Sequence, residues 1–355
     1  MKVFVYAICK NESKFVDRWV KSMSEADGIY VLDTGSTDDS VSRLKDLGVN
    51  VVSAEISPWR FDVARNRSLE LVPDCDICVC TDLDEVFVPG WRSILEDVWG
   101  SDTTRLRYNY NWKLDGEKPV VNFYIEKIHS RYGYKWVHPV HEVLSYDGEE
   151  HFVTTDLITV NHYPDVTKSR SSYLPLLEMS VLENPSDDRN MHYLGREYMY
   201  YGMWKKSIET LKKHLELPSA TWRDERCASM RFIARCYKNI DDYDSSCFWL
   251  DKAMSEAPYL RDPFMERALL EYKYENWNNV ILYCLRALDI DTHPKSYINE
   301  VFSFDGTVYD LLSISYYNIG IYDKALFYVE KAIEMNPDDE RLLNNKKVFL
   351  EILNV

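Results

Sequence analysis

The 355-residue sequence is poor in glycine and has no long apolar stretch. Only 12 residues are glycine, while 26 are tyrosine and 10 are tryptophan, a balance that suits helix-on-helix packing better than a loop-rich β fold. No run of about 18 apolar residues occurs, so we expect no membrane-spanning helix. The short apolar stretch at the N-terminus gives way to Lys10, Asn11 and Glu12, which is typical of a strand and not of a secretory signal.

Basic residues are also in the minority. The chain has 42 Lys and Arg against 58 Asp and Glu, which gives a formal net charge of −16 at pH 7. Such an acidic average field repels a phosphate backbone and disfavours nucleic acid as a partner. The eight cysteines form no disulfide framework, and the cluster of Cys75, Cys78 and Cys80 lacks a second Cys or His pair at zinc-finger spacing. We therefore expect buried thiols and a reducing, cytoplasmic compartment.

The length predicts two domains, and the N-terminal one shows alternating strands and helices. Strands are expected at residues 2–9, 28–32, 49–54 and 76–81, with helices at 13–23, 39–47 and 61–71 between them. This alternation is typical of βαβ units and a mostly parallel sheet. Between residues 105 and 160 we expect short antiparallel strands, at 104–112, 122–128 and 158–162.

A helical repeat follows a connecting helix expected at residues 164–183. Four segments combine a small residue, an aromatic three or four positions later and an aromatic at a turn; the turn aromatics are Trp204, Tyr243, Trp277 and Tyr322. These segments resemble the tetratricopeptide repeat, a helical hairpin of about 34 residues; generic helical hairpins are the alternative. Residues 338–353 would cap the array. We expect the concave face to bind a peptide or protein, or to form a homo-oligomer.

The acidic motif Asp82-Leu83-Asp84-Glu85 directly follows a predicted buried strand. The carboxyl ends of parallel strands form the edge where open α/β sheets hold ligands. A nucleoside diphosphate leaving group is highly charged, and a divalent cation can bridge its phosphates. Hard oxygen ligands at this spacing can supply one metal ligand and one contact to sugar hydroxyls. The motif therefore predicts a Mn²⁺ or Mg²⁺ site with Asp84 and Asp82 as ligands.

With its neighbouring motifs, residues 1–165 resemble glycosyltransferase family 2, whose fold is the nucleotide-sugar-binding GT-A type. The matching motifs are Ile8-Cys9-Lys10-Asn11-Glu12, the segment 31–38 around Asp33, Trp59, Phe61, Ala64-Arg65-Asn66 and the acidic motif. The resemblance implies that Ile8, Lys10, Asn11 and Asp33 hold the nucleoside and that Arg65, Asn66 and Asp82 contact the rest of the donor. Many relatives carry a second acid where Thr34 stands. Alternatively, Asp33 is a turn residue and Arg65 forms an ion pair.

A second polar cluster lies at Trp136-Val137-His138-Pro139-Val140-His141-Glu142-Val143. Strand alternation would place His141 and Glu142 on opposite faces. Similar transferases carry a His-Glu pair here, so the resemblance implies Glu142 as the base that deprotonates the acceptor, with His141 second and Glu85 as a rival. It also implies that His162 completes the metal site, where an imidazole favours Mn²⁺ over Mg²⁺. A purely structural histidine is the alternative.

Together these features predict an α/β GT-A domain at residues 1–165, a linker at 166–190 and tetratricopeptide-like repeats at 191–355. The expected activity is inverting transfer of a hexose from a UDP-sugar to a hydroxyl or thiol acceptor, which can belong to a peptide or protein. One alternative is a catalytically inactive, repeat-based protein-binding scaffold, and another is a transferase acting on a cell-surface glycan. A nucleotidyltransferase is disfavoured because the loop after the first strand contains no glycine.

Overall fold

The computed structural model describes residues 1–165, 167 and 173–354. Its residues divide into two compact units. Unit 1 comprises Met1–Glu183 together with Lys295–Tyr297, and unit 2 comprises Asn184–Pro294 and Ile298–Val355. The connecting segment expected at 164–183 includes residues 166 and 168–172, which lie outside the described residues, and a helix is found only over its second part, as α5 (Tyr173–Glu183) of unit 1.

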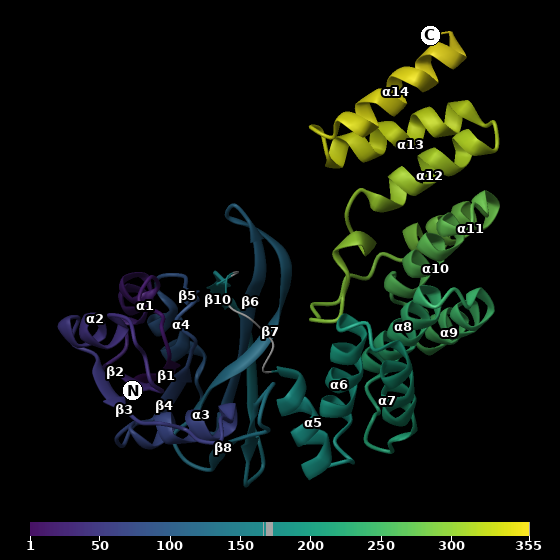
Figure 1. Cartoon of the computed structure of the whole chain (residues 1–355). Coiled ribbons are helices and arrows are strands. Elements are labelled where there is room, and N and C mark those ends of the chain that lie inside the picture. The colour runs from purple at the N-terminus through teal and green to yellow at the C-terminus, as the bar shows by residue number, and fades with distance from the viewer. Residues whose placement is uncertain (166, 168–172, 355) are drawn as a thin grey trace. The chain divides into compact units, whose positions relative to one another are not determined.

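Unit 1 is built on a mixed sheet whose strands run in the order β3-β2-β1-β4-β7-β6-β10-β5 within the described residues (Figure 1). The strands are β1 (Val3–Cys9), β2 (Gly28–Asp33), β3 (Asn50–Ser53), β4 (Ile77–Cys80), β5 (Glu85–Phe87), β6 (Arg105–Asp115), β7 (Lys118–Ser130) and β10 (Phe152–His162). Strands β1 to β4 are parallel to one another. The predicted parallel half of the sheet is thus confirmed.

The helices of unit 1 follow the predicted alternation. They are α1 (Val16–Met23), α2 (Ser40–Asp46), α3 (Phe61–Glu70), α4 (Trp91–Val98) and α5. Helix α4 and strand β5 are not apparent in the sequence pattern, because β5 is only three residues long. Gly90 adopts a φ of 89°, which lets the chain turn from β5 into α4.

The region from 105 to 160 differs from the prediction in two ways. Strand β6 extends three residues further than expected, β7 is much longer than expected, and the two form an antiparallel hairpin that is prominent in Figure 1. Strand β10 is also longer, and it pairs antiparallel with β5 but parallel with β6, so the antiparallel expectation holds for only one of its two neighbours. The reason is the small hairpin of β8 (Tyr134–Val137) and β9 (Val143–Tyr146), after which the chain returns to the start of β6. The Thr104 amide there donates to the His151 carbonyl at 3.0 Å.

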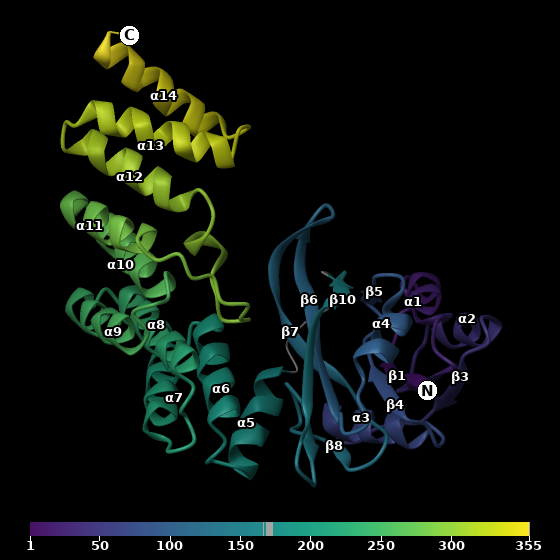
Figure 2. The same cartoon turned by 180° about the vertical axis from the view of Figure 1, so that it is seen from behind.

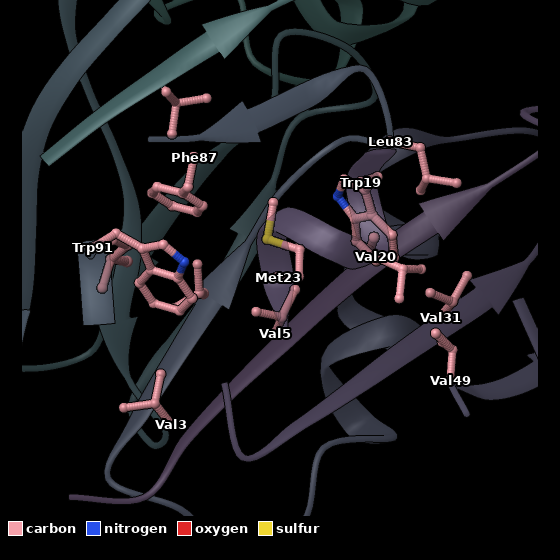
Figure 3. Packing of buried hydrophobic residues seen from close by; sticks show 14 of the residues in the cluster. Val3, Val5, Trp19, Val20, Met23, Val31, Val49, Leu83, Phe87 and Trp91 are labelled. Carbon is pink, nitrogen blue, oxygen red and sulfur yellow. The ribbon is translucent and has the colours of Figure 1, made fainter. Parts of the chain in front are cut away.

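The core of unit 1 lies between the sheet and helices α1 and α4. Figure 3 shows Trp19 and Met23 of α1 packed against the strands, with Phe87 facing Trp91. The rings of Phe87 and Trp91 stack with centroids 4.8 Å apart. The buried Trp19 indole donates to Thr81 Oγ1 at 3.0 Å, so the α1 core contact reaches the residue that precedes the acidic motif. The same packing that stabilises the sheet therefore fixes the start of that motif.

Unit 2 is a series of helical hairpins with a final capping helix, and successive helices lie side by side in both views (Figures 1 and 2). The helices are α6 (Asp188–Tyr200), α7 (Trp204–Glu216), α8 (Arg223–Asn239), α9 (Tyr243–Glu256), α10 (Asp262–Lys273), α11 (Trp277–Leu288), the 3₁₀ turn η1 (Val301–Ser303), α12 (Thr307–Asn318), α13 (Tyr322–Met335) and α14 (Glu340–Leu353). Each of the four predicted turn aromatics is the first residue of the second helix of its hairpin. No helix in the described part of the chain is long and apolar enough to span a bilayer.

The small residues of the repeat lie where paired helices approach most closely. A Cβ atom placed on Gly195 of α6 would lie 2.5 Å from the Leu211 side chain of α7. Ser207 Oγ of α7 donates to the Gly195 carbonyl at 2.8 Å. The next hairpin repeats this bond between Ser246 and the Ala234 carbonyl, at 2.9 Å. The close approach of α6 and α7 thus explains the small residue at Gly195, and the first two hairpins share the serine-to-carbonyl bond beside it.

Candidate active site at the carboxyl edge of the sheet

Three adjacent parallel strands end beside one another and bring their following residues together. In the register of β1 and β2, Cys9 lies opposite Asp33, and β4 pairs with the other side of β1. The order β2-β1-β4 therefore places Lys10 and Asn11, Asp33 and Asp82 at one edge of the sheet. This is the edge that the sequence pattern predicts as the ligand-binding one.

The turns after β1 and β2 are tied to each other by side chains. The Asp33 carboxylate is buried and accepts from the Gly35 amide at 3.3 Å and the Ser36 amide at 3.1 Å. Asn11 has a φ of 55°, and its Oδ1 accepts from the Thr37 amide at 2.7 Å. Asp33 thus has the turn-forming role that is the alternative to nucleoside binding. Both residues hold the loops that border the adjacent cleft.

That cleft has a volume of about 670 Å³. Its lining combines polar and apolar side chains from the ends of β1, β2 and β3: Lys10, Thr34, Gly35, Ser53, Ala54, Glu55, Ile56 and Trp59. Ile8 packs with Leu32 and Trp59 in a small apolar cluster beside it. The cleft is within the usual size range of a small-ligand pocket.

Arg65 of α3 links two of the predicted site carboxylates. Its Nη2 lies 2.8 Å from Asp82 Oδ1, and its Nε lies 2.5 Å from Glu142 Oε1. The side chain is buried, with the guanidinium 5.1 Å from the centre of the Trp136 ring. Burial by itself would raise the pKa of Asp82, but the charges of Arg65 and Lys127 lower it well below its usual range. Arg65 is therefore a buried ion-pair centre.

Lys127 is a site residue that the sequence reasoning missed. Its Nζ lies 2.9 Å from Asp82 Oδ2 and 2.7 Å from Glu85 Oε1. It reaches them because β7 pairs with β4, which only the fold establishes. The one available signal was a lone lysine within the apolar and aromatic segment 122–128. Both oxygens of Asp82 thus contact cationic side chains.

Glu85 lies deeper than the other carboxylates of the site. It accepts from the Tyr110 hydroxyl at 3.0 Å and from the Asp82 amide at 3.0 Å, in addition to its contact with Lys127. Its exposed fraction is only 2%. Burial raises its pKa above the usual range. These contacts fix the position of the acidic motif.

Asp84 and His162 lie together on the other side of the motif. His162 Nε2 is 3.4 Å from Asp84 Oδ2, and its Nδ1 is 3.1 Å from the Trp112 carbonyl. The imidazole stacks on the Trp112 ring with centroids 4.4 Å apart. Two ligands of one first-row metal ion, at bonds of roughly 2.1 Å and angles of 90–109°, lie about 3.0–3.4 Å apart. One carboxylate and one oriented imidazole thus fit a divalent cation. Asp82 is not one of these two ligands.

The loop between β8 and β9 carries the second polar cluster. The expectation of a strand there is wrong, because residues 138–142 form a loop. Within this loop His138 and His141 have φ values of 81° and 51°. The turn at Pro139 is held by α3, since the Phe61 amide donates to the Pro139 carbonyl at 2.9 Å. Glu142 reaches Arg65, while the His141 ring lies edge-on to Tyr173, 5.8 Å away.

Asn66 contacts protein backbone in this structure. Its side-chain amide donates to the Trp136 carbonyl and accepts from the Trp136 amide, both at 2.8 Å. Asn66 thereby adds a pair of ladder-like hydrogen bonds between α3 and β8. This places it as a residue that positions the loop carrying Glu142.

Unit 2 contains a separate concavity of about 450 Å³. Its lining comes mostly from α6, α8, α9 and α10 and includes Tyr200, Trp204, Arg235, Lys238, Glu266 and Phe302. Arg235 is paired there with Glu266 at 2.7 Å and Glu300 at 2.5 Å.

Comparison with known proteins identifies the repeat in unit 2. Residues 306–339 match the tetratricopeptide repeat, which confirms the predicted repeat at α12 and α13. Solved structures that resemble the chain include MamA (18% identity, TM-score 0.38, covering 48% of this chain and 85% of that one) and YrrB, described as a TPR protein with an unusual peptide-binding site (16%, 0.40, 50% and 84%). Another is TTC0263, described as a thermophilic TPR protein in Thermus thermophilus (19%, 0.34, 51% and 90%). The chain thus carries a helical tetratricopeptide repeat region.

Proposed function

We propose that unit 1 is a metal-dependent glycosyltransferase that uses a nucleoside-diphosphate sugar. The observation that supports this best is the Asp84–His162 pair beside the network of Arg65, Asp82 and Lys127 at the carboxyl edge of the parallel strands. A diphosphate needs a cationic partner, and because Arg65 and Lys127 are already paired with carboxylates, the divalent ion that Asp84 and His162 would hold supplies that charge. The adjacent 670 Å³ cleft supplies room for the nucleoside.

In the proposed reaction an acceptor hydroxyl or thiol attacks the anomeric carbon of the sugar. The new bond to that carbon forms as the bond to the diphosphate oxygen breaks, and the leaving diphosphate takes the bonding electron pair. A divalent cation held by Asp84 and His162 would neutralise the charge that develops on the diphosphate. The acceptor proton passes to a carboxylate of the site.

Glu142 is the better candidate for this base. Its carboxylate lies on a loop, and its side chain is 11% exposed compared with 2% for Glu85. Glu85 is committed to Lys127, Tyr110 and the Asp82 amide, so moving it would disturb the acidic motif. Arg65 fixes one oxygen of Glu142 and thereby orients the other. His141, the second candidate, lies on the same loop.

The donor and acceptor remain part of the proposal. The family resemblance favours a UDP-hexose, and the repeats favour a peptide or protein acceptor. The deciding experiment is a panel of UDP-, GDP- and CMP-sugars incubated with Mn²⁺, with release of the nucleotide as the readout. We expect release from a UDP-hexose, abolished by chelation. No release from any donor, together with no nucleotide-dependent rise in thermal stability, would reject the transferase.

The second candidate is a protein-binding scaffold without catalysis. The tetratricopeptide repeat at 306–339 and the concavity beside Tyr200 and Trp204 favour it. Helical arrays of this kind present extended concave binding surfaces. The same donor panel separates the two candidates, because a scaffold without catalysis would release no nucleotide. The scaffold also predicts that the Trp204→Ala variant no longer binds the partner protein.

A further inference from the structure

A second group of metal-ligating side chains lies in unit 2, outside the proposed active site. Asp188 in the first turn of α6, His214 in the last turn of α7 and Glu225 in the first turn of α8 converge there. One ligand atom from each lies within 4.8 Å of the others. His214 and Glu225 are buried and Asp188 is partly exposed.

The buried imidazole of His214 provides an independent sign of a ligand. Its Nε2 lies 3.4 Å from Glu225 Oε1 but makes no hydrogen bond to any of the residues that the structure describes. The side chain is 0% exposed. A buried polar atom without a hydrogen bond is costly and calls for an explanation, and an ion is one of the common ones.

The other nitrogen of His214 is already engaged. Its Nδ1 lies 2.9 Å from Ser229 Oγ, which in turn lies 2.7 Å from Nδ1 of His192. A hydroxyl carries a single hydrogen, so Ser229 can donate to one ring and accept from the other. When Ser229 donates to His192 and accepts from His214 Nδ1–H, the His214 Nε2 lone pair faces the two carboxylates. This arrangement matches the outer hydrogen bond that orients most metal-binding histidines.

The distances fit a small cation. The 3.4 Å between His214 Nε2 and Glu225 Oε1 falls at the upper end of the roughly 3.0–3.4 Å expected for two ligands bound to one ion at about 2.1 Å. The Asp188 oxygen lies within 4.8 Å of the other two ligand atoms, and its side chain is partly exposed, so it would have to move toward them to bind the same ion. One imidazole and two carboxylates suit a borderline divalent ion such as Zn²⁺ better than the oxygen-preferring Mg²⁺ or Ca²⁺.

We propose that Asp188, His214 and Glu225 form a zinc site that links α6, α7 and α8. The site would connect the first helical hairpin of unit 2 to the start of the second. Like other structural metal sites, it would contribute to folding stability. The partial exposure of Asp188 leaves room for a water molecule as the fourth ligand. This proposal is independent of the transferase activity assigned to unit 1.

The test measures zinc binding by the metal-stripped full chain. An Asp84→Asn background removes the proposed active-site ligand, so that binding reports on unit 2 alone. Equilibrium dialysis against buffered Zn²⁺ should give one equivalent, and Zn²⁺ should raise the melting temperature. In this background, Asp188→Asn should weaken binding at least tenfold, and Ser229→Ala should weaken it about 10–100-fold as the loss of an outer partner. Glu209→Gln, an exposed change on α7, is the matched control.

Circular dichroism identifies any variant that fails to fold. Asp188→Asn is the decisive variant, because a change at a partly exposed side chain disturbs the fold least. Absence of zinc binding by the folded chain would show an ordinary buried ion pair of His214 with Glu225 and would overturn the proposal. Equal zinc affinity in the Asp188→Asn, His214→Gln and parent proteins would overturn it as well. Loss of binding in these variants but not in Glu209→Gln supports the site.

Discussion

Arg65 and Asp82 form an ion pair in which the Nη2 of the buried guanidinium lies 2.8 Å from the first carboxylate of the acidic motif, whose side chain is 34% exposed. Because Lys127 contacts the other Asp82 oxygen, that residue faces two cations. Asp84, two residues later, lies instead beside His162. The two aspartates of one short motif thus have different surroundings, and we expect them to have different roles.

We predict that Asp84→Asn abolishes metal-dependent nucleotide release while the fold is retained. The substitution removes the anionic ligand beside His162 but keeps a similar side-chain volume. Nucleotide release with titrated Mn²⁺ measures the effect. Asp97→Asn, an exposed change on α4, is the control and should leave release unchanged. Unaltered release by Asp84→Asn would remove this residue from the metal site.

Replacement of Arg65 should strongly destabilise unit 1. Arg65→Ala leaves Asp82 and Glu142 buried or half-buried without their shared cation. Breaking a buried ion pair from one side costs about 3–5 kcal/mol, and this applies to the pair with Glu142, which is 11% exposed, more than to the pair with Asp82, which is 34% exposed. Urea unfolding followed by tryptophan fluorescence measures the change, and Arg67→Ala on the exposed face of α3 is the matched control. Equal unfolding midpoints for the two variants would contradict the structural role of the pair.

Stability should fall below about pH 6.5 partly because of His129. The buried ring accepts from the Tyr6 hydroxyl at 2.8 Å through Nε2 and donates from Nδ1 to the Ser130 carbonyl at 2.7 Å, so the neutral form satisfies both nitrogens. Burial lowers its pKa from 6.5 to about 3. The unfolded state therefore binds one more proton between these values, and stability is lost as the pH falls through that window.

The slope attributable to one such proton is about 1.4 kcal/mol per pH unit. Chemical unfolding at a series of pH values from 7 to 4 measures it. The His129→Gln protein should show a shallower dependence than the parent, whereas the exposed change His151→Gln should not. An unchanged slope in His129→Gln would show that this ring does not carry the effect.

A methyl group at Gly195 should destabilise the first helical hairpin. Its Cβ would lie 2.5 Å from Leu211 Cγ, and overpacking of a filled interior costs about 1–3 kcal/mol. The loss should exceed the small gain in helix propensity from alanine. Thermal unfolding of Gly195→Ala measures the effect, with exposed Glu209→Ala on α7 as control. A combination with Leu211→Ala should cost less than the two changes summed, and full additivity would argue against the clash.

Much of the parallel half of unit 1 is predictable because its strands are continuous apolar runs separated by amphipathic helices. The repeats are also predictable from the sequence, since the same structural position is taken by an aromatic residue in each hairpin, namely Trp204, Tyr243, Trp277 and Tyr322. The 45 residues from Trp277 to Tyr322 exceed the 34 from Tyr243 to Trp277 because the chain between α11 and α12 carries the extra turn η1. Lys127, by contrast, could not be found, since its partners come from β4 and only strand pairing brings β7 beside it.

The sequence by itself determined the alternation of strands and helices, the helical repeat and the acidic motif at a strand end, because these follow from local periodicity and turn chemistry. Only the tertiary structure decided that Arg65 and Lys127 surround Asp82 while His162 lies beside Asp84. These contacts join residues separated by 17, 45 and 78 positions, and no local pattern encodes them. They depend on the order of strands in the sheet, which the packing of the whole unit determines.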